Sequence, residues 1–264
     1  MRLRLDLALV ERGLAESRTR AQALVMEGKV RVAGQVERKA SRVLDDSAEI
    51  EVESPPRFVS RGGEKLEGAF RLWGPGNGER GTGNRELGTG LAVDGKVCLD
   101  VGSSTGGFTD CLLQHGARFV MAVDVGTNQL AYKLRTDPRV WVRENFNARY
   151  MTSADLPETP EVAVTDVSFI SLRLILPPIR DVLAPGGLAV TLIKPQFEVG
   201  KGKAPGGLVR DEALRIEARD GIVDFARGEL GLELLGLEES PIRGREMGNV
   251  EYLSFWRKPA SALV

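Results

Sequence analysis

Residues 97–124 read VCLDVGSSTGGFTDCLLQHGARFVMAVD, and this stretch decides the fold. An apolar run at 97–101 leads into a loop with three glycines, and residues 108–114 have the pattern of a helix start. A second apolar run at 119–123 ends at Asp124. Strand, glycine loop, helix and strand in this order predict a βαβ unit, and therefore an α/β domain built on a parallel sheet.

The glycine loop has the chemistry of a small-ligand site. Glycine lacks a Cβ and tolerates positive φ, so the backbone at Gly102, Gly106 and Gly107 can approach a ligand closely. The spacing D-x-G-x-x-x-G-G from Asp100 differs from the dinucleotide motif and resembles the first motif of S-adenosylmethionine-dependent methyltransferases. A nucleotide-dependent oxidoreductase and a purely structural βα turn stay open as alternatives. The carboxylate of Asp100 suits an ammonium group and would repel a pyrophosphate, while Asp124 is placed to meet a ribose diol.

Polar residues end several predicted strands, namely Asp100, Asp124, Asp166 and Lys194. In an open α/β sheet, ligands and reacting groups gather at the carboxyl ends of the strands. Methyl transfer from a sulfonium to a hydroxyl requires positioned partners and removal of a proton. Desolvation at a partly buried strand end disfavours an ammonium, although nearby carboxylates oppose that effect. Lys194 is therefore the candidate base.

The remaining periodicity extends the α/β pattern along the chain. Helices are predicted at 67–72, 128–135, 172–183 with an interruption at the two prolines, and 209–230. Strands are predicted at 140–143, 161–165 and 188–193, followed by an antiparallel pair at 232–237 and 252–256. We expect a Rossmann-like domain with a mostly parallel, seven-stranded sheet.

The N-terminal segment predicts a small, basic α+β domain. Residues 1–43 contain ten Lys/Arg and five Asp/Glu, although the whole chain has a net charge of −1. Helices at 4–12 and 18–27, with Ser17 as N-cap of the second, precede a hairpin at 29–36 and a strand at 49–52. The order LDxxLVExGLAxSRxxAxxLVxxGxVxVxG from Leu5 to Gly34 resembles the S-four (S4) RNA-binding domain. An ordinary solvated charged face is the alternative reading.

Composition also predicts the domain limits. Paired prolines after Ser54 separate a domain at 1–54 from a linker at 55–64 and a catalytic domain at 65–264. Residues 74–90 contain seven glycines and almost nothing apolar, which predicts a flexible surface insert.

The sequence gives little support for a metal site, a membrane segment or a signal peptide. Cys98 and Cys111 fall at positions that predict burial, without a third residue to complete a metal set, so we expect no metal. His115, the only histidine, falls at a predicted helix end beside Gly116, where a capping role is expected. The chain has no long apolar run and no signal-peptide pattern, which predicts a cytoplasmic protein.

Further motifs cover nearly the whole chain. The runs FVSRGGxKLE, VDVGxxQL, DVSFISLRLILP, LIKPQFE and GNxEYL resemble the TlyA, or haemolysin A, family of ribosomal RNA ribose 2′-O-methyltransferases, whose catalytic domain has an FtsJ-like fold. The resemblance implies S-adenosyl-L-methionine as cofactor and ribosomal RNA or ribosomal subunits as partner. The family's catalytic Lys-Asp-Lys-Glu tetrad falls on Lys65, Asp166, Lys194 and Glu251.

The resemblance also implies roles for other residues. The cofactor would be bound by Asp100, Gly102, Ser103, Ser104, Gly106, Gly107, Phe108, Asp124 and, through the run E-x-x-N-A-R, Asn147. RNA would be bound, mostly through phosphates, by Arg4, Arg18, Arg20, Lys29, Arg31, Arg57 and Arg61. The target is expected to be a cytidine ribose. The sequence leaves the oligomeric state open between a monomer and a weak dimer. The alternatives are a catalytically inactive RNA-binding ribosome assembly factor and a membrane-active haemolysin.

Overall fold

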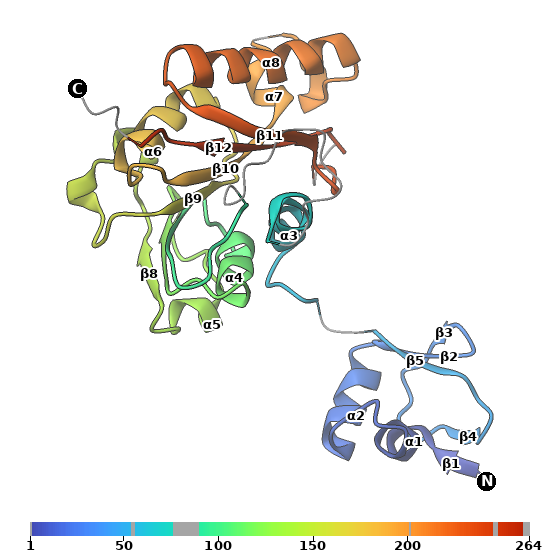
Figure 1. Ribbon diagram of the computed structural model, residues 1–264. Coiled ribbons are helices and arrows are strands. Elements are labelled where there is room, and N and C mark those ends of the chain that lie inside the picture. The colour runs from blue at the N-terminus through green and yellow to red at the C-terminus, as the bar shows by residue number, and fades with distance from the viewer. Residues whose placement is uncertain (1, 54–55, 76–89, 201, 245–247, 261–264) are drawn as a thin grey trace. The chain divides into compact units, whose positions relative to one another are not determined.

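The computed structural model describes residues 2–53, 56–75, 90–200, 202–244 and 248–260. The chain forms two compact units, Met1–Arg57 and Phe58–Val264 (Figure 1). Their division lies within the predicted linker at 55–64, whose last residues, 62–64, already belong to a helix of the second unit. Most of the predicted insert at 74–90 lies outside the described residues.

The first unit packs two helices against two small sheets. Ser17 caps the second helix, because its side chain accepts a hydrogen bond from the Arg20 backbone N–H at 3.2 Å. Ala33 and Gly34 form the hairpin turn, both with positive φ. Two short strands that pair with each other, β1 and β4, were not predicted. In chain order the elements are β1 (Arg2–Arg4), α1 (Leu5–Glu11), α2 (Arg18–Met26), β2 (Val30–Val32), β3 (Gln35–Val36), β4 (Val43–Asp45) and β5 (Ile50–Val52).

The second unit is built on a seven-stranded sheet in the order β11-β12-β10-β9-β6-β7-β8. The five strands from β10 to β8 are parallel, and β12 pairs antiparallel with both β10 and β11. The strands are β6 (Val97–Val101), β7 (Phe119–Val123), β8 (Val140–Arg143), β9 (Val162–Thr165), β10 (Leu188–Ile193), β11 (Glu233–Glu239) and β12 (Tyr252–Arg257). The predicted fold class is confirmed.

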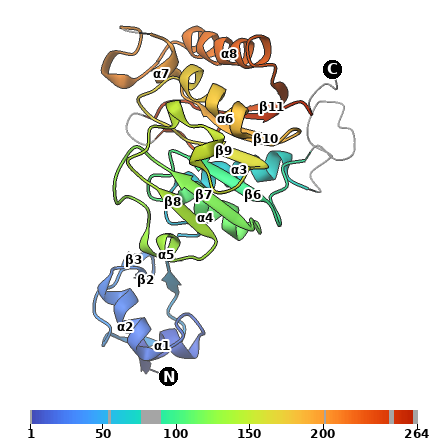
Figure 2. The same cartoon turned by 90° about the vertical axis from the view of Figure 1, so that its left-hand side faces the viewer.

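Helices cover both faces of this sheet (Figures 1 and 2). Alternate strand residues such as Cys98 and Val120 pack towards α3 and α4, while Leu99 and Met121 pack towards α6 and α8. This alternation explains why the central strands are apolar throughout. The helices are α3 (Gly62–Trp73), α4 (Gly107–Gln114), α5 (Tyr132–Arg135), α6 (Leu176–Val182), α7 (Pro195–Glu198) and α8 (Glu212–Gly228), with 3₁₀ turns at Ala148–Tyr150, Ser153–Asp155, Leu172–Leu174 and Pro205–Gly207.

Some predicted helix limits were wrong. Helix α3 begins five residues before the predicted start at 67, so Lys65 lies in its first turn. Residues 128–130 are not helical, because their backbone N–H groups bind Glu144 instead. Pro177 and Pro178 do not interrupt a helix; they occupy the first turn of α6, where a missing N–H costs nothing. None of the described helices is long and apolar enough to span a membrane.

Candidate active site

The glycine loop joins β6 to α4 at the point where the strand order reverses between β6 and β9. Gly102 and Gly106 have φ of 81° and 98°. A Cβ on Gly102 would lie 3.2 Å from the carbonyl oxygen of Asp166, so the loop begins directly against the end of β9. Ser104 donates its backbone N–H to Asp124 Oδ2 at 2.8 Å. The structure therefore brings together the loop, Asp124 and Asp166, as the strand pattern predicts.

Asp100 is fully buried below this loop. Its Oδ2 accepts a hydrogen bond from Thr109 Oγ1 at 2.6 Å, whereas no group in the described ranges donates to its Oδ1. Burial raises the pKa of Asp100 to about 7, against the opposing hydrogen bonds from Thr109; the charges of Asp166 and Asp124 raise it further. An acceptor left without a donor beside a glycine loop fits a ligand that carries an ammonium group.

The other residues predicted to bind the cofactor differ in their surroundings. Gly107 lies under the chain that enters α3, since a Cβ there would be 2.3 Å from Ser60 Oγ and 2.7 Å from the Gly63 nitrogen. Ser103 is buried in the loop. Phe108 directs its side chain into the hydrophobic core instead of the loop. Asn147 is exposed, and its side chain accepts a hydrogen bond from the Arg149 N–H.

Glu144 holds the loop that follows β7. Its carboxylate accepts hydrogen bonds from the backbone N–H groups of Asn128, Gln129 and Leu130. It also forms an ion pair with Arg135 at 2.7 Å. Although burial opposes the charge, Arg135 and these amides lower the pKa of Glu144 to about 2. The sequence pattern alone predicted a helix here, and only the run E-x-x-N-A-R pointed to Glu144.

Four charged side chains of alternating sign meet at the carboxyl ends of β9 and β10. Lys194 Nζ lies 2.5 Å from Asp166 Oδ1 and donates to Ser168 Oγ at 2.9 Å. Lys65 Nζ, which comes from α3, lies 3.5 Å from Asp166 Oδ2 and 2.7 Å from Glu251 Oε2. The structure therefore gathers Lys65, Asp166, Lys194 and Glu251 into one cluster.

These side chains are largely buried, so the pKa values of Lys65 and Asp166 are set by their charged neighbours. Lys65, Lys194 and Glu251 are each less than a tenth exposed. Burial opposes the charge on Lys65, but Asp166 and Glu251 outweigh it and raise the pKa of Lys65. Burial likewise opposes the charge on Asp166, and the two lysines lower its pKa. Lys65 is therefore held as a cation and Asp166 as an anion.

The predicted RNA contacts of the first unit already have partners within that unit. Arg4 and Arg18 both pair with the buried Asp6, at 3.0 and 2.9 Å, and Arg4 in particular holds the pKa of Asp6 well below its usual range. Lys29 pairs with Glu27, and Arg31 donates to the Gly34 carbonyl at 3.2 Å. Arg20 is half-buried and lies 3.9 Å from Glu27, whereas Arg57 and Arg61 are exposed. The side chains of Arg4 and Arg18 remain 41% and 53% exposed, so pairing with Asp6 leaves them accessible to a phosphate.

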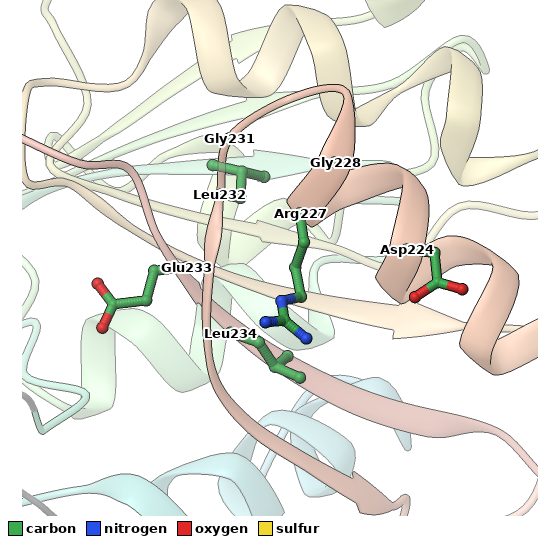
Figure 3. A pocket seen from close by; sticks show the side chains of 7 residues that line it. All are labelled: Asp224, Arg227, Gly228, Gly231, Leu232, Glu233 and Leu234. Carbon is green, nitrogen blue, oxygen red and sulfur yellow. The ribbon is translucent and has the colours of Figure 1, made fainter.

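A pocket elsewhere on the second unit is formed by other residues. It is lined by the end of α8 and the start of β11, including Arg227, Glu233 and Leu234 (Figure 3). No site residue predicted from the sequence lines this pocket. The alternating-charge cluster and the glycine loop together are therefore the candidate active site.

Comparisons with known proteins show the family of the chain. The FtsJ-like methyltransferase family matches residues 58–258, and the S4 domain family matches residues 3–50. A Bacillus subtilis protein described as an rRNA methyltransferase, YqxC, is 45% identical over 255 residues, which cover 95% of this chain and 84% of the relative. The 16S/23S rRNA (cytidine-2′-O)-methyltransferase TlyA of Mycobacterium tuberculosis is 42% identical over 259 residues, 97% of this chain and 90% of the relative.

A solved structure is similar over nearly the whole chain. It comes from Streptococcus thermophilus, carries the name hemolysin, and superimposes with a TM-score of 0.71 at 39% identity, covering 98% of this chain and 90% of the other. The chain belongs to the FtsJ-like methyltransferase family, in its TlyA or haemolysin A branch with an N-terminal S4 domain.

Proposed function

We propose that this protein transfers a methyl group from S-adenosyl-L-methionine to a ribose 2′-hydroxyl of ribosomal RNA, at a cytidine. The observation that carries the proposal is the cluster of Lys65, Asp166, Lys194 and Glu251 beside the glycine loop. The name of the Mycobacterium tuberculosis relative supports the choice of cytidine and of ribosomal RNA.

The glycine loop fits the proposed cofactor. Asp100 Oδ1, which lacks a donor within the described part of the chain, would accept a hydrogen bond from the ammonium of the methionine part. Asp124 would bind the ribose diol, and the loop held by Glu144 would border the adenosine. When bound, S-adenosyl-L-methionine supplies an electrophilic methyl group on a sulfonium.

Lys194 would remove the proton from the 2′-hydroxyl. A neutral lysine amine has two N–H groups and one lone pair. Ser168 Oγ accepts an N–H of Lys194 at 2.9 Å, and Asp166 Oδ1 lies 2.5 Å from the same nitrogen as its ion-pair partner. Held on these two sides, a neutral Lys194 would turn its lone pair to the hydroxyl proton. Lys65 and Glu251 would hold Asp166 in place from its other side. The chain's contribution is thus positioning and general-base catalysis.

The first unit would bring the RNA to this site. Its partly exposed Arg4, Arg18, Arg20 and Lys29 would contact phosphates, as would its exposed Arg31 and Arg57. Arg61, in the second unit, would do the same. The partner would be ribosomal RNA or a ribosomal subunit, and a protein with this substrate would act in the cytoplasm.

Methylation of ribosomal subunits tests the proposal. Subunits from a strain without the modification are incubated with the protein and S-adenosyl-L-methionine labelled on its methyl group, and 2′-O-methylation is then mapped. We expect label on one or more cytidine riboses, and none with Lys194→Ala, assayed at a temperature at which circular dichroism shows that this variant is folded. Absence of label with the unaltered chain, or unchanged label with Lys194→Ala, would overturn the proposal; the first result would favour an inactive assembly factor.

A further inference from the structure

A second group of reactive side chains lies between α3 and α4. Glu67 Oε2, Cys111 Sγ and His115 Nε2 all lie within 4.8 Å of one another. His115 Nε2 is 2.7 Å from Glu67 Oε2, and Cys111 Sγ is 4.0 Å from the same oxygen. Cys111 lies on α4 and His115 is the C-cap of that helix, four residues later, which places both on the same side of it; Glu67 faces them from α3.

Most of this group is buried. Cys111 is fully buried, Glu67 is 7% exposed, and the His115 side chain is 29% exposed. A buried carboxylate needs a positive partner, and the Arg71 guanidinium lies 3.8 Å away, beside the other oxygen, Oε1. In the absence of an ion, the Cys111 thiol donates a weak hydrogen bond to Glu67 Oε2, the same oxygen that His115 Nε2 meets, so the thiol and the imidazole are both directed at one carboxylate.

The three groups match the ligands of a borderline transition metal. Thiolate, imidazole and carboxylate are the side chains that bind Zn²⁺ in proteins. One thiolate and one carboxylate also balance the charge of a divalent cation. Phe70 stacks on the His115 ring at 3.8 Å between centroids and fixes its orientation, as supporting contacts do around metal-bound histidines.

We propose that Glu67, Cys111 and His115 form a binding site for Zn²⁺ or a similar transition-metal ion, with water as a further ligand. Binding releases the thiol proton and requires the His115 proton on Nδ1, which leaves the lone pair of Nε2 for the metal. The ion would join α3 to α4. Lys65 lies on α3 and the glycine loop leads into α4, so the site would stiffen the scaffold behind the candidate active site. The inference does not depend on the proposed function.

Metal titration of the full chain, without a histidine tag and stripped with a chelator, tests the site. The chain has one histidine and two cysteines, so few other strong ligands compete. We expect one Zn²⁺ per chain by calorimetry, and with Co²⁺ a thiolate-to-metal charge-transfer band in the near ultraviolet. Zn²⁺ should also raise the melting temperature, because it binds only the folded chain.

Cys98 provides a matched control, because it is equally buried but lies on β6 and outside the group. Cys98→Ala should keep the Co²⁺ band, and Cys111→Ala should lose it. His115→Gln, at a partly exposed position, should fold normally and bind at least about 100-fold more weakly, since loss of an outer-shell partner alone costs roughly 10- to 100-fold. No Zn²⁺ binding by the unaltered chain, or binding unchanged by both Cys111→Ala and His115→Gln, would overturn the proposal.

Discussion

The Lys65 ammonium lies 2.7 Å from Glu251 Oε2, although 186 positions separate the two residues in the chain. On its other side Lys65 faces Asp166, which in turn pairs with Lys194. Two lysines and two carboxylic residues therefore alternate in a largely buried row. Removing any one of them leaves a buried charge with too little compensation.

Lys65→Met should lower the free energy of unfolding by about 3 to 5 kcal/mol, because it leaves Asp166 and Glu251 buried without their shared cation. Urea denaturation measures the loss. The double variant Lys65→Met/Glu251→Gln should recover part of it, since one of the unpaired charges is then removed. Lys96→Met, at the amino end of β6, should leave stability unchanged. Equal losses in the single and double variants would contradict a direct pairing.

Ser168→Ala should reduce the rate of methyl transfer about tenfold at saturating substrate, because Lys194 loses the acceptor that orients one of its N–H groups. The KM for S-adenosyl-L-methionine should stay the same. Ser168→Thr retains the hydroxyl and should restore the rate. A loss of rate in both variants would instead indicate a packing defect.

Asp100 should make stability depend on pH. Its pKa is raised to about 7, so between about pH 4 and pH 7 the folded chain binds a proton that the unfolded chain releases. The free energy of unfolding should therefore fall as pH rises through this range and level off above pH 7, with a contribution of up to about 4 kcal/mol.

Asp100→Asn removes this contribution. Compared with the unaltered chain, the variant should gain stability as pH rises from 4 to 8, as measured by denaturation at each pH. The exposed Asp94 offers the matched variant Asp94→Asn, which should follow the unaltered chain. A constant difference between Asp100→Asn and the unaltered chain across this range would exclude a raised pKa.

Gly107→Ala should weaken cofactor binding and destabilise the second unit, because the added Cβ would lie 2.3 Å from Ser60 Oγ and 2.7 Å from the backbone nitrogen of Gly63. Calorimetry with S-adenosyl-L-methionine and thermal melting measure the two effects. Gly228, at the end of α8, has nothing within 4 Å of such a Cβ. Gly228→Ala should be neutral or stabilising by up to about 1 kcal/mol.

Arg31→Ala should weaken RNA binding and lower the dependence of log affinity on log salt concentration by about one, as expected for loss of a phosphate contact. Filter binding over a salt series measures both. Arg118 pairs with Glu158 in the second unit, and Arg118→Ala serves as the matched loss of one positive charge. Equal salt dependences for the two variants would show that Arg31 does not contact phosphate.

Local patterns predicted the sheet well. The strands at 97–101, 119–123 and 188–193 have the predicted limits, because buried parallel strands are continuous apolar runs. The proximity of Asp166 to Lys194 also followed from the sequence, since the carboxyl ends of neighbouring parallel strands share one edge. The strand β1 was missed because Arg2–Arg4 is short and charged, and it forms only by pairing with β4, about 40 residues away.

The sequence by itself determined the two-unit plan, the glycine loop and the polar strand ends, because apolar periodicity, glycine and capping residues act over a few positions. Only the tertiary structure decided that Lys65 reaches Asp166 and Glu251, that Asp100 Oδ1 is left without a donor in the described chain, and that Glu67 meets Cys111 and His115. These contacts depend on how helices pack on the sheet, and that packing sets distances between residues that no local pattern relates.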